Sequence, residues 1–118
     1  MDKPITNGIV FRVDKERNYT CIDNQPLSVK NMSLKSKGLL CLILSLPPSW
    51  DYSIEGLSQI CEEGIGTIRR CIDELKELGY VEIKTFYPNE TEDGRFHYEY
   101  IIHERSITPE KLKMIWDK

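Results

Sequence analysis

Two stretches of the chain place apolar side chains three or four residues apart, which is the spacing of one face of an α-helix. The first stretch covers residues 34–46 and the second covers residues 65–78. The apolar positions are Leu34, Leu39, Leu42, Ile43 and Leu46 in the first stretch, and Ile65, Ile68, Cys71, Ile72, Leu75 and Leu78 in the second. We expect each stretch to form a helix and to bury this face in a shared core.

Residues that favour helix ends lie beside these stretches. Ser33 precedes the first and can accept a hydrogen bond from a free backbone N–H, and two prolines end it at positions 47–48. Gly79 follows the second, where glycine accepts the left-handed conformation that closes many helices. Between the two, Ser53 is placed to begin a short helix with apolar positions in residues 54–61. The pattern therefore predicts three helices.

Residues 80–87 and 96–103 show a different pattern, in which every second side chain is apolar. Val81 and Ile83 alternate with Glu82 and Lys84, and the second run alternates in the same way. A period of two is typical of a half-buried strand. The intervening residues 88–95 are polar and include an Asp-Gly pair that favours a turn. The two runs therefore predict a β-hairpin.

The two ends of the chain carry weaker patterns. Alternating apolar residues near Ile9 and again near Tyr19 indicate a further hairpin or arm. After residue 106, Thr108 can cap a helix and Pro109 suits its first turn. The apolar stripe of this predicted amphipathic helix is Leu112, Ile115 and Trp116.

The order of these elements predicts an α+β fold of the winged helix-turn-helix class. Two helices joined by a short glycine-containing turn form a helix-turn-helix, and a hairpin directly after the second helix forms the wing. We divide the chain into an N-terminal strand or hairpin arm (residues 1–30), a winged-helix domain (31–105) and a C-terminal helix (106–118).

Composition narrows the class of protein. The chain has 118 residues, of which 40% are hydrophobic and 30% charged, so we expect one globular domain with a modest core. We see neither a membrane-spanning run nor an N-terminal secretion signal, which favours the cytoplasm and no membrane partner. The net charge is −3, whereas nucleic-acid binders are usually basic. The charge therefore predicts that any DNA binding is weak as a lone domain, focused on sequence, or shared with partners.

The central residues also resemble a known family. The opening "SLKSKGLL" (residues 33–40), the block "LPPSWDYSIEGL" (46–57) and the exit "LKELGYV" (75–81) resemble the helix-turn-helix domain of phage and mobile-element replication proteins of low-GC Gram-positive bacteria. These are replisome-organiser or DnaD-like proteins. The resemblance covers about 100 residues. It implies a winged helix and a role in replication or control of a mobile element, and it identifies no partner. Our own expectation is that the chain binds double-stranded DNA and could bind replication proteins.

A DNA-binding winged helix inserts the outward face of its third helix into the major groove. The polar residues that we expect to contact DNA from this helix are Thr67, Arg69, Arg70 and Lys76. Arginine can bridge two acceptors of a guanine, and the two arginines lie near the start of the helix. Lys84 and Arg95 are the hairpin cations that could touch phosphate, although the tip is otherwise acidic. Lys35 and Lys37 of the first helix are candidate backbone contacts.

We predict no catalytic or metal site. The four cysteines contain no C-x-x-C pair, and His97 and His103 would lie about 20 Å apart on one strand. No serine, cysteine or carboxylate is evidently paired with either histidine for catalysis. The chain is therefore expected to act by binding, without a cofactor.

Other interpretations of the same pattern stay open. The arginines of the third helix could pair with carboxylates four residues on, Arg69 with Asp73 and Arg70 with Glu74, and form an ordinary solvated surface. The winged helix could serve as a protein–protein assembly module of a replication complex, or the chain could be a small transcriptional regulator. The C-terminal helix could form a homodimer contact, or it could pack on the first helix or the N-terminal hairpin.

Overall fold

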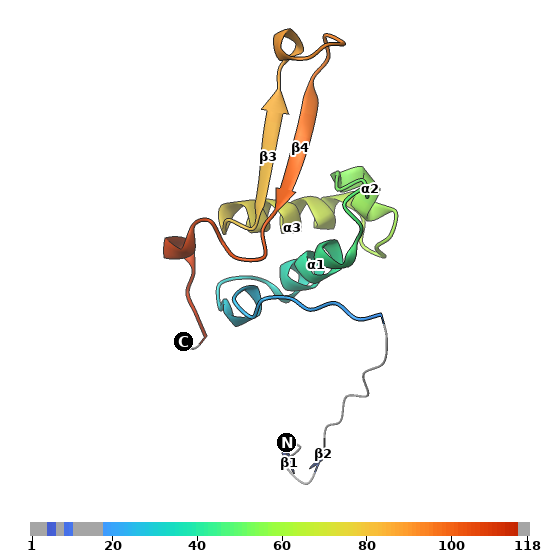
Figure 1. Cartoon of the computed structure of the whole chain (residues 1–118). Helices are drawn as coiled ribbons and strands as arrows, with labels where there is room; N and C mark the ends of the chain where they lie inside the picture. The colour runs from blue at the N-terminus through green and yellow to red at the C-terminus, as the bar shows by residue number, and fades with distance from the viewer. Residues whose placement is uncertain (1–4, 7–8, 11–17, 116–118) are drawn as a thin grey trace.

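The computed structural model describes residues 5–6, 9–10 and 18–115. This part of the chain contains three α-helices, α1 (Leu34–Ser45), α2 (Ile54–Ser58) and α3 (Ile65–Glu77). An antiparallel hairpin of β3 (Val81–Phe86) and β4 (His97–Ile102) follows α3 directly (Figure 1). The fold is therefore α+β, with three helices and a two-stranded hairpin, and it is compatible with the predicted winged helix.

The predicted caps set the helix boundaries. Ser33 accepts a hydrogen bond from the backbone N–H of Ser36 at 3.2 Å, and Ser53 accepts one from Gly56 at 3.1 Å. Gly79 has a φ of 85°, the left-handed conformation expected after α3. Helix α2 is shorter than its apolar pattern suggests. After Ser58 the N–H of Ile60 binds the carbonyl of Leu57, three residues back, which is tighter than an α-helical turn.

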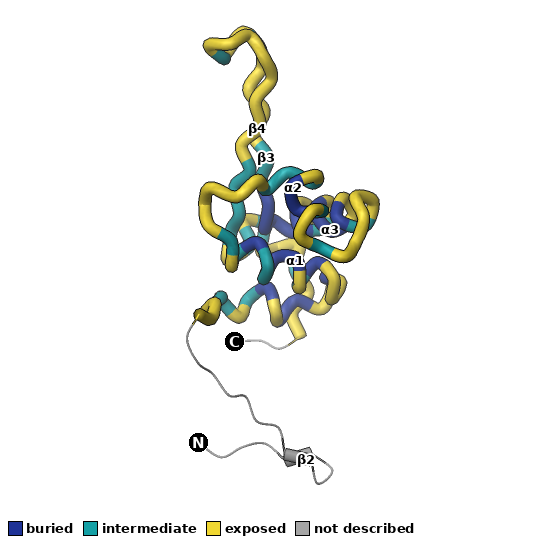
Figure 2. Tube along the Cα trace, turned by 90° about the vertical axis from the view of Figure 1, so that its right-hand side faces the viewer, coloured by how far each residue is buried: buried dark blue, intermediate teal, exposed yellow. Residues whose placement is uncertain are grey.

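The core lies between α1, α3 and the base of the hairpin. Of the predicted helix positions, Leu39, Ile68, Ile72 and Leu75 are buried, while Leu42 is partly buried against them. Other members come from α2, from the segment before α1 and from the residues after α3; they include Val29, Leu57, Tyr80 and Val81. Figure 2 shows this burial in the body and exposed residues along the outer hairpin.

Tyr80 connects the start of the hairpin to two distant segments. Its side chain is fully buried and its hydroxyl donates a hydrogen bond to Gln25 Oε1 at 3.2 Å. The same oxygen accepts a hydrogen bond from the N–H of Ser106 at 2.6 Å. Burial raises the pKa of Tyr80 to about 12, so the phenol stays protonated and keeps its donor at physiological pH.

The predicted C-terminal helix is wrong within the described residues. Only Pro109–Lys111 forms a turn, of the 3-10 type, and the chain then runs extended beside residues 28–31. The N–H of Lys30 binds Lys113 O at 2.6 Å, and the N–H of Ile115 binds Ser28 O at 2.7 Å. We call residues 28–31 with 111–115 the strap. These long-range hydrogen bonds use backbone groups that a helix would have bonded internally.

Leu112 and Ile115, which were predicted to share one face of that helix, differ in burial. Leu112 packs partly buried against the core, whereas Ile115 is exposed, and Trp116 lies outside the described residues. The homodimer contact expected of this segment stays a prediction.

At the N-terminus, β1 (Ile5–Thr6) pairs with β2 (Ile9–Val10) in a short antiparallel hairpin. The second part of the predicted N-terminal hairpin, near Tyr19, is wrong, because residues 19–22 form no strand in the part of the chain that the structure describes. The residues between Val10 and Asn18 lie outside the described part. Pro26, Ser28 and Val29 are buried in the main core.

Candidate nucleic-acid interface

Helix α3 presents three exposed cations. Arg69, Arg70 and Lys76 all lie on its solvent side, away from the buried row of Ile68, Ile72 and Leu75. Arg69 and Lys76 are seven residues apart and so share one flank of the helix. Arg70 occupies the other flank, where its guanidinium donates a hydrogen bond to Thr67 Oγ1 at 3.2 Å. The two arginines therefore lie on either side of the line along α3 that faces most directly into solvent.

The carboxylates of α3 do not pair with these arginines in the way that sequence spacing allows. The described residues form four ion pairs: His97–Asp93, His103–Glu82, Arg105–Asp23 and Lys111–Glu77. None includes a cation predicted to contact DNA from α3 or the hairpin. Glu77 pairs instead with Lys111 of the tail at 3.3 Å. The arginines of α3 are therefore available to an external anion.

Glu74 binds the start of α1 across the helix interface. Its Oε1 accepts hydrogen bonds from both the backbone N–H and the hydroxyl of Ser33, each at 2.8 Å. Partial burial acts to raise the pKa of Glu74, but hydrogen bonds from Ser36 and Ser33 outweigh it and hold the pKa below its usual value. The charge lies at the positive end of the α1 dipole, where an anion is favoured.

The N-terminus of α3 differs from those of α1 and α2. Gly64 occupies the cap position, and so no side chain accepts a hydrogen bond there. Gly66 follows in the first turn, where an added Cβ would find no atom within 4 Å. Internal packing therefore does not require glycine at this position. Its effect is to leave the backbone of the first turn open to close approach, with its N–H groups directed outward.

A groove runs between α1 and α3 and brings several predicted residues together. A hollow of about 260 Å³ has Lys35, Thr67 and the apolar side chains of Leu39 and Leu42 in its lining. A second hollow shares Lys35 and Thr67 and adds Arg70. Lys35, Thr67 and Arg70 thus form one group.

The other candidate residues lie apart from that group. Lys37 donates a hydrogen bond to the carbonyl of Leu27 at 3.3 Å, which gives its ammonium an internal partner. Lys84 is exposed on β3, and Arg95 is exposed at the tip of the hairpin. The predicted contacts therefore come from three separate parts of the molecule.

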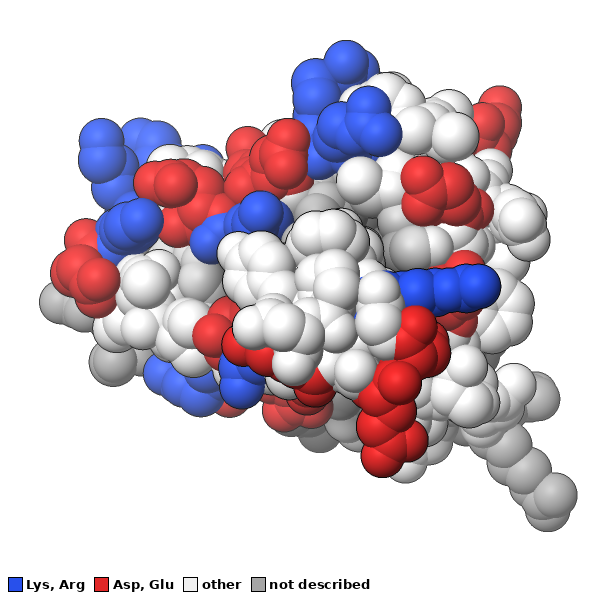
Figure 3. All heavy atoms as spheres, turned by 90° about the horizontal axis from the view of Figure 1, so that it is seen from above, with Lys and Arg blue, Asp and Glu red and all other residues white. Residues whose placement is uncertain are grey.

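The surface seen from the hairpin end carries mixed charge. Figure 3 shows Lys and Arg groups separated by Asp and Glu groups on this face, without a continuous basic stripe. Electrostatic attraction for DNA would therefore come from the local cations of α3 rather than from the whole face.

The structure gives no indication of a metal site or a membrane span among the residues it describes. No three His, Cys, Asp or Glu side chains in this part gather where they could hold an ion. None of its helices has the length and apolar character needed to cross a bilayer.

Comparison of the chain with protein-family models, with curated proteins and with solved structures found no match. Function must therefore be argued from the geometry of the chain itself.

Proposed function

We propose that this chain is a winged-helix module that binds double-stranded DNA through α3 and acts without catalysis. The observation that carries the proposal is the pair of exposed arginines, Arg69 and Arg70, near the uncapped N-terminus of α3. In this arrangement α3 is the helix that enters the major groove, and its N-terminal residues reach deepest.

The engagement of two of the α3 carboxylates elsewhere supports this proposal. Glu74 binds Ser33 and Glu77 binds Lys111, so neither holds an arginine of α3. An arginine that is not held in an ion pair can present its fork of donors to a guanine or to a phosphate. Gly66 adds room for the helix backbone to approach the groove.

The replication context rests on the resemblance of residues 33–81 to replication proteins of phages and mobile elements. In that context the module would position a larger assembly on DNA by binding alone. The chain's net charge of −3 fits a binder whose contacts are few and local, because a general affinity for nucleic acid would need a basic surface.

The test is a salt titration of binding to random-sequence duplex and to duplex taken from a replication origin. Arg70→Ala should weaken binding by about 1–3 kcal/mol, because one arginine contact to a base is worth that much. Lys113→Ala is the matched control, since it removes the same charge from the exposed tail, and it should leave affinity nearly unchanged. Equal binding by the parent, Arg69→Ala and Arg70→Ala would rule out α3 as the reading helix. Absence of duplex binding at low salt would favour the assembly role instead.

A further inference from the structure

The outer half of the β3–β4 hairpin exposes aromatic side chains that the fold does not bury. Burial stops near the base, where Val81 is 3% exposed, whereas Tyr98 is 60% and Phe96 is 53% exposed. Figure 2 shows the outer hairpin exposed along almost its whole length. Large apolar side chains in water contribute nothing to the core, and they carry a risk of aggregation at a free sheet edge. The outer hairpin is therefore longer and more apolar than the fold requires.

These side chains form a continuous stripe on one face of the hairpin. Ile83 pairs with Tyr100 and Thr85 pairs with Tyr98, and cross-strand partners point to the same side of a sheet. Beyond the last pairs on this face, the rings of Tyr87 and Phe96 meet edge to face with centroids 5.7 Å apart. We call Tyr87, Phe96, Tyr98 and Tyr100 the aromatic stripe.

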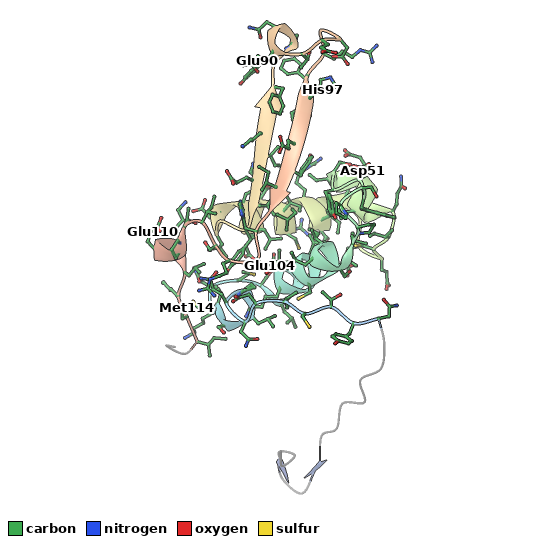
Figure 4. The ribbon with its side chains drawn as sticks, viewed as in Figure 1. Asp51, Glu90, His97, Glu104, Glu110 and Met114 are labelled. Atoms are coloured by element: carbon green, nitrogen blue, oxygen red, sulfur yellow. The ribbon has the colours of Figure 1, made fainter. Side chains whose placement is uncertain are left out.

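The tip that carries the end of this stripe is held by its own hydrogen bonds. The N–H of Tyr87 binds Glu90 Oε2 at 2.9 Å, and Thr91 Oγ1 donates to the carbonyl of Arg95 at 2.8 Å. The His97 Nε2 atom lies 2.8 Å from Asp93 Oδ1 (Figure 4 labels Glu90 and His97 at the tip). A surface ordered before binding loses less conformational entropy when a partner arrives.

The charge around the stripe disfavours a phosphate backbone as its ligand. Residues 81–103 contain two cations, Lys84 and Arg95, and five carboxylates, which gives a balance of −3. The carboxylates are Glu82, Glu90, Glu92, Asp93 and Glu99. A protein surface that binds nucleic acid needs a net positive charge to attract the phosphates. The hairpin therefore favours a partner that is apolar and basic.

Two more carboxylates lie near the base of the stripe. The pKa of Tyr100 is raised, chiefly by partial burial and further by the negative charges of Glu55 and Asp51. Asp51 lies beside α2 and Glu55 within it (Figure 4 labels Asp51). The acidic character thus continues from the hairpin onto the adjoining helix.

Strand β4 itself combines aromatic and acidic side chains, which alternate along it. Tyr98 and Tyr100 face the stripe side, whereas Glu99 between them faces the other side. The sheet has only two strands, so the outer edge of β4 has no neighbouring strand in the part of the chain that the structure describes. A free strand edge accepts an extended peptide through main-chain hydrogen bonds, with alternate side chains giving specificity.

From this pattern we propose that the outer hairpin docks an extended segment of a partner protein in which apolar and basic side chains alternate. The segment adds beside β4, with its apolar side chains on the aromatic stripe and its basic side chains near Glu99. This docking is independent of DNA binding by α3, because the two surfaces share no residue.

The test uses the intact chain and short capped peptides that alternate lysine with valine, leucine or phenylalanine. Matched peptides carry glutamate in place of lysine. Binding is followed by heteronuclear NMR, which reports both affinity and the residues affected. We expect at least one lysine peptide to bind with shifts centred on β4, and the glutamate peptides to bind at least about tenfold more weakly.

Two variants locate the interaction, and one serves as a control. The double variant Phe96→Ser with Tyr98→Ser should lose at least about tenfold in affinity for the lysine peptide. Glu99→Lys should weaken the lysine peptide and strengthen its glutamate counterpart. Tyr19→Ser removes an equally exposed aromatic outside the hairpin and should change nothing. All four substituted sites are exposed, so thermal unfolding should show that the variants fold as the parent does.

Several results would overturn the proposal. It fails if no lysine peptide binds below about 1 mM, or if lysine and glutamate peptides bind alike. Loss of duplex DNA affinity in the double variant would assign the stripe to nucleic acid. Concentration-dependent dimerisation of the parent that the double variant abolishes would assign it to a second copy of this chain. Failure of Arg70→Ala to affect DNA would leave the docking result untouched, so the two proposals fail separately.

Discussion

The two hydrogen bonds from Ser33 to Glu74 predict how much stability the chain loses when this carboxylate is changed. Glu74→Gln keeps the shape of the side chain but removes its charge, while Glu74→Ala removes both hydrogen bonds to Ser33. Hydrogen bonds to a charged group contribute about 1.5–3 kcal/mol, and a charge at a helix N-terminus adds about 0.3–1. Glu74 is only partly buried, so solvent screening reduces the sum. We expect the free energy of unfolding to fall by about 1 kcal/mol in Glu74→Gln and by about 2 kcal/mol in Glu74→Ala.

The assay is urea and thermal unfolding of the parent and both variants at several pH values. The pKa of Glu74 is lowered in the folded chain, so its stabilisation is fully present above the unfolded value of about 4.5. The stabilisation is lost as the pH falls through the lower folded pKa. The difference between the parent and Glu74→Gln should therefore stay constant above about pH 5.5 and shrink in more acidic buffer. At neutral pH, 1 kcal/mol corresponds to about 4–8 °C in Tm for a domain of this size.

Glu77→Gln is the matched control, because it removes the same charge from the same helix. Glu77 is 71% exposed and pairs with Lys111 at 3.3 Å, an arrangement expected to contribute less than about 0.5 kcal/mol. If Glu74→Gln and Glu77→Gln were equally stable, or if the deficit of Glu74→Gln persisted unchanged in acid, the cap across the helices would not contribute as argued.

Two glycines should respond to alanine in opposite directions, and both effects are measured by urea unfolding. Gly79→Ala should destabilise by at least about 2 kcal/mol, because the left-handed φ disfavours a side chain. Its Cβ would also lie 2.5 Å from Thr108 Oγ1 and 2.6 Å from Ser106 Oγ; a loss below about 0.5 kcal/mol would contradict this account. Gly38→Ala should stabilise by about 0.5–1 kcal/mol, because Gly38 lies inside α1 and an added Cβ meets nothing within 4 Å. A destabilised Gly38→Ala would show that the groove beside it tolerates no added methyl.

The parts of the fold that were predictable are those set by neighbours in sequence. The apolar spacing of residues 65–78 and the glycine after it predict α3 to within a residue or two, and Ser33 predicts the start of α1. Alternation predicts the hairpin and which side chains share a face. Alternation does not indicate how much of the hairpin packs against the helices, so it could not show that Tyr98 is exposed.

The parts that were not predictable depend on partners far along the chain. Thr108 and Pro109 form a good local start for a helix, yet Lys113 and Ile115 bond to residues about 80 positions earlier. Likewise, Glu74 has an arginine four residues before it in sequence but binds Ser33, 41 positions away. The candidate DNA contacts could be named from residue type and helix phase, but only the structure shows that Arg69 and Arg70 form no ion pair with the described residues.

The strap also orders the assembly of the molecule in time. The three helices and the hairpin are built largely from contacts between consecutive elements, so they close short loops and should form early in folding. The bond from Lys113 to Asn31 spans 82 residues, so it closes a much longer loop and should form later. Until then the segment before α1, with the buried Val29, lacks its neighbour. A folding chain would therefore complete its helices and hairpin before the two segments of the strap are joined.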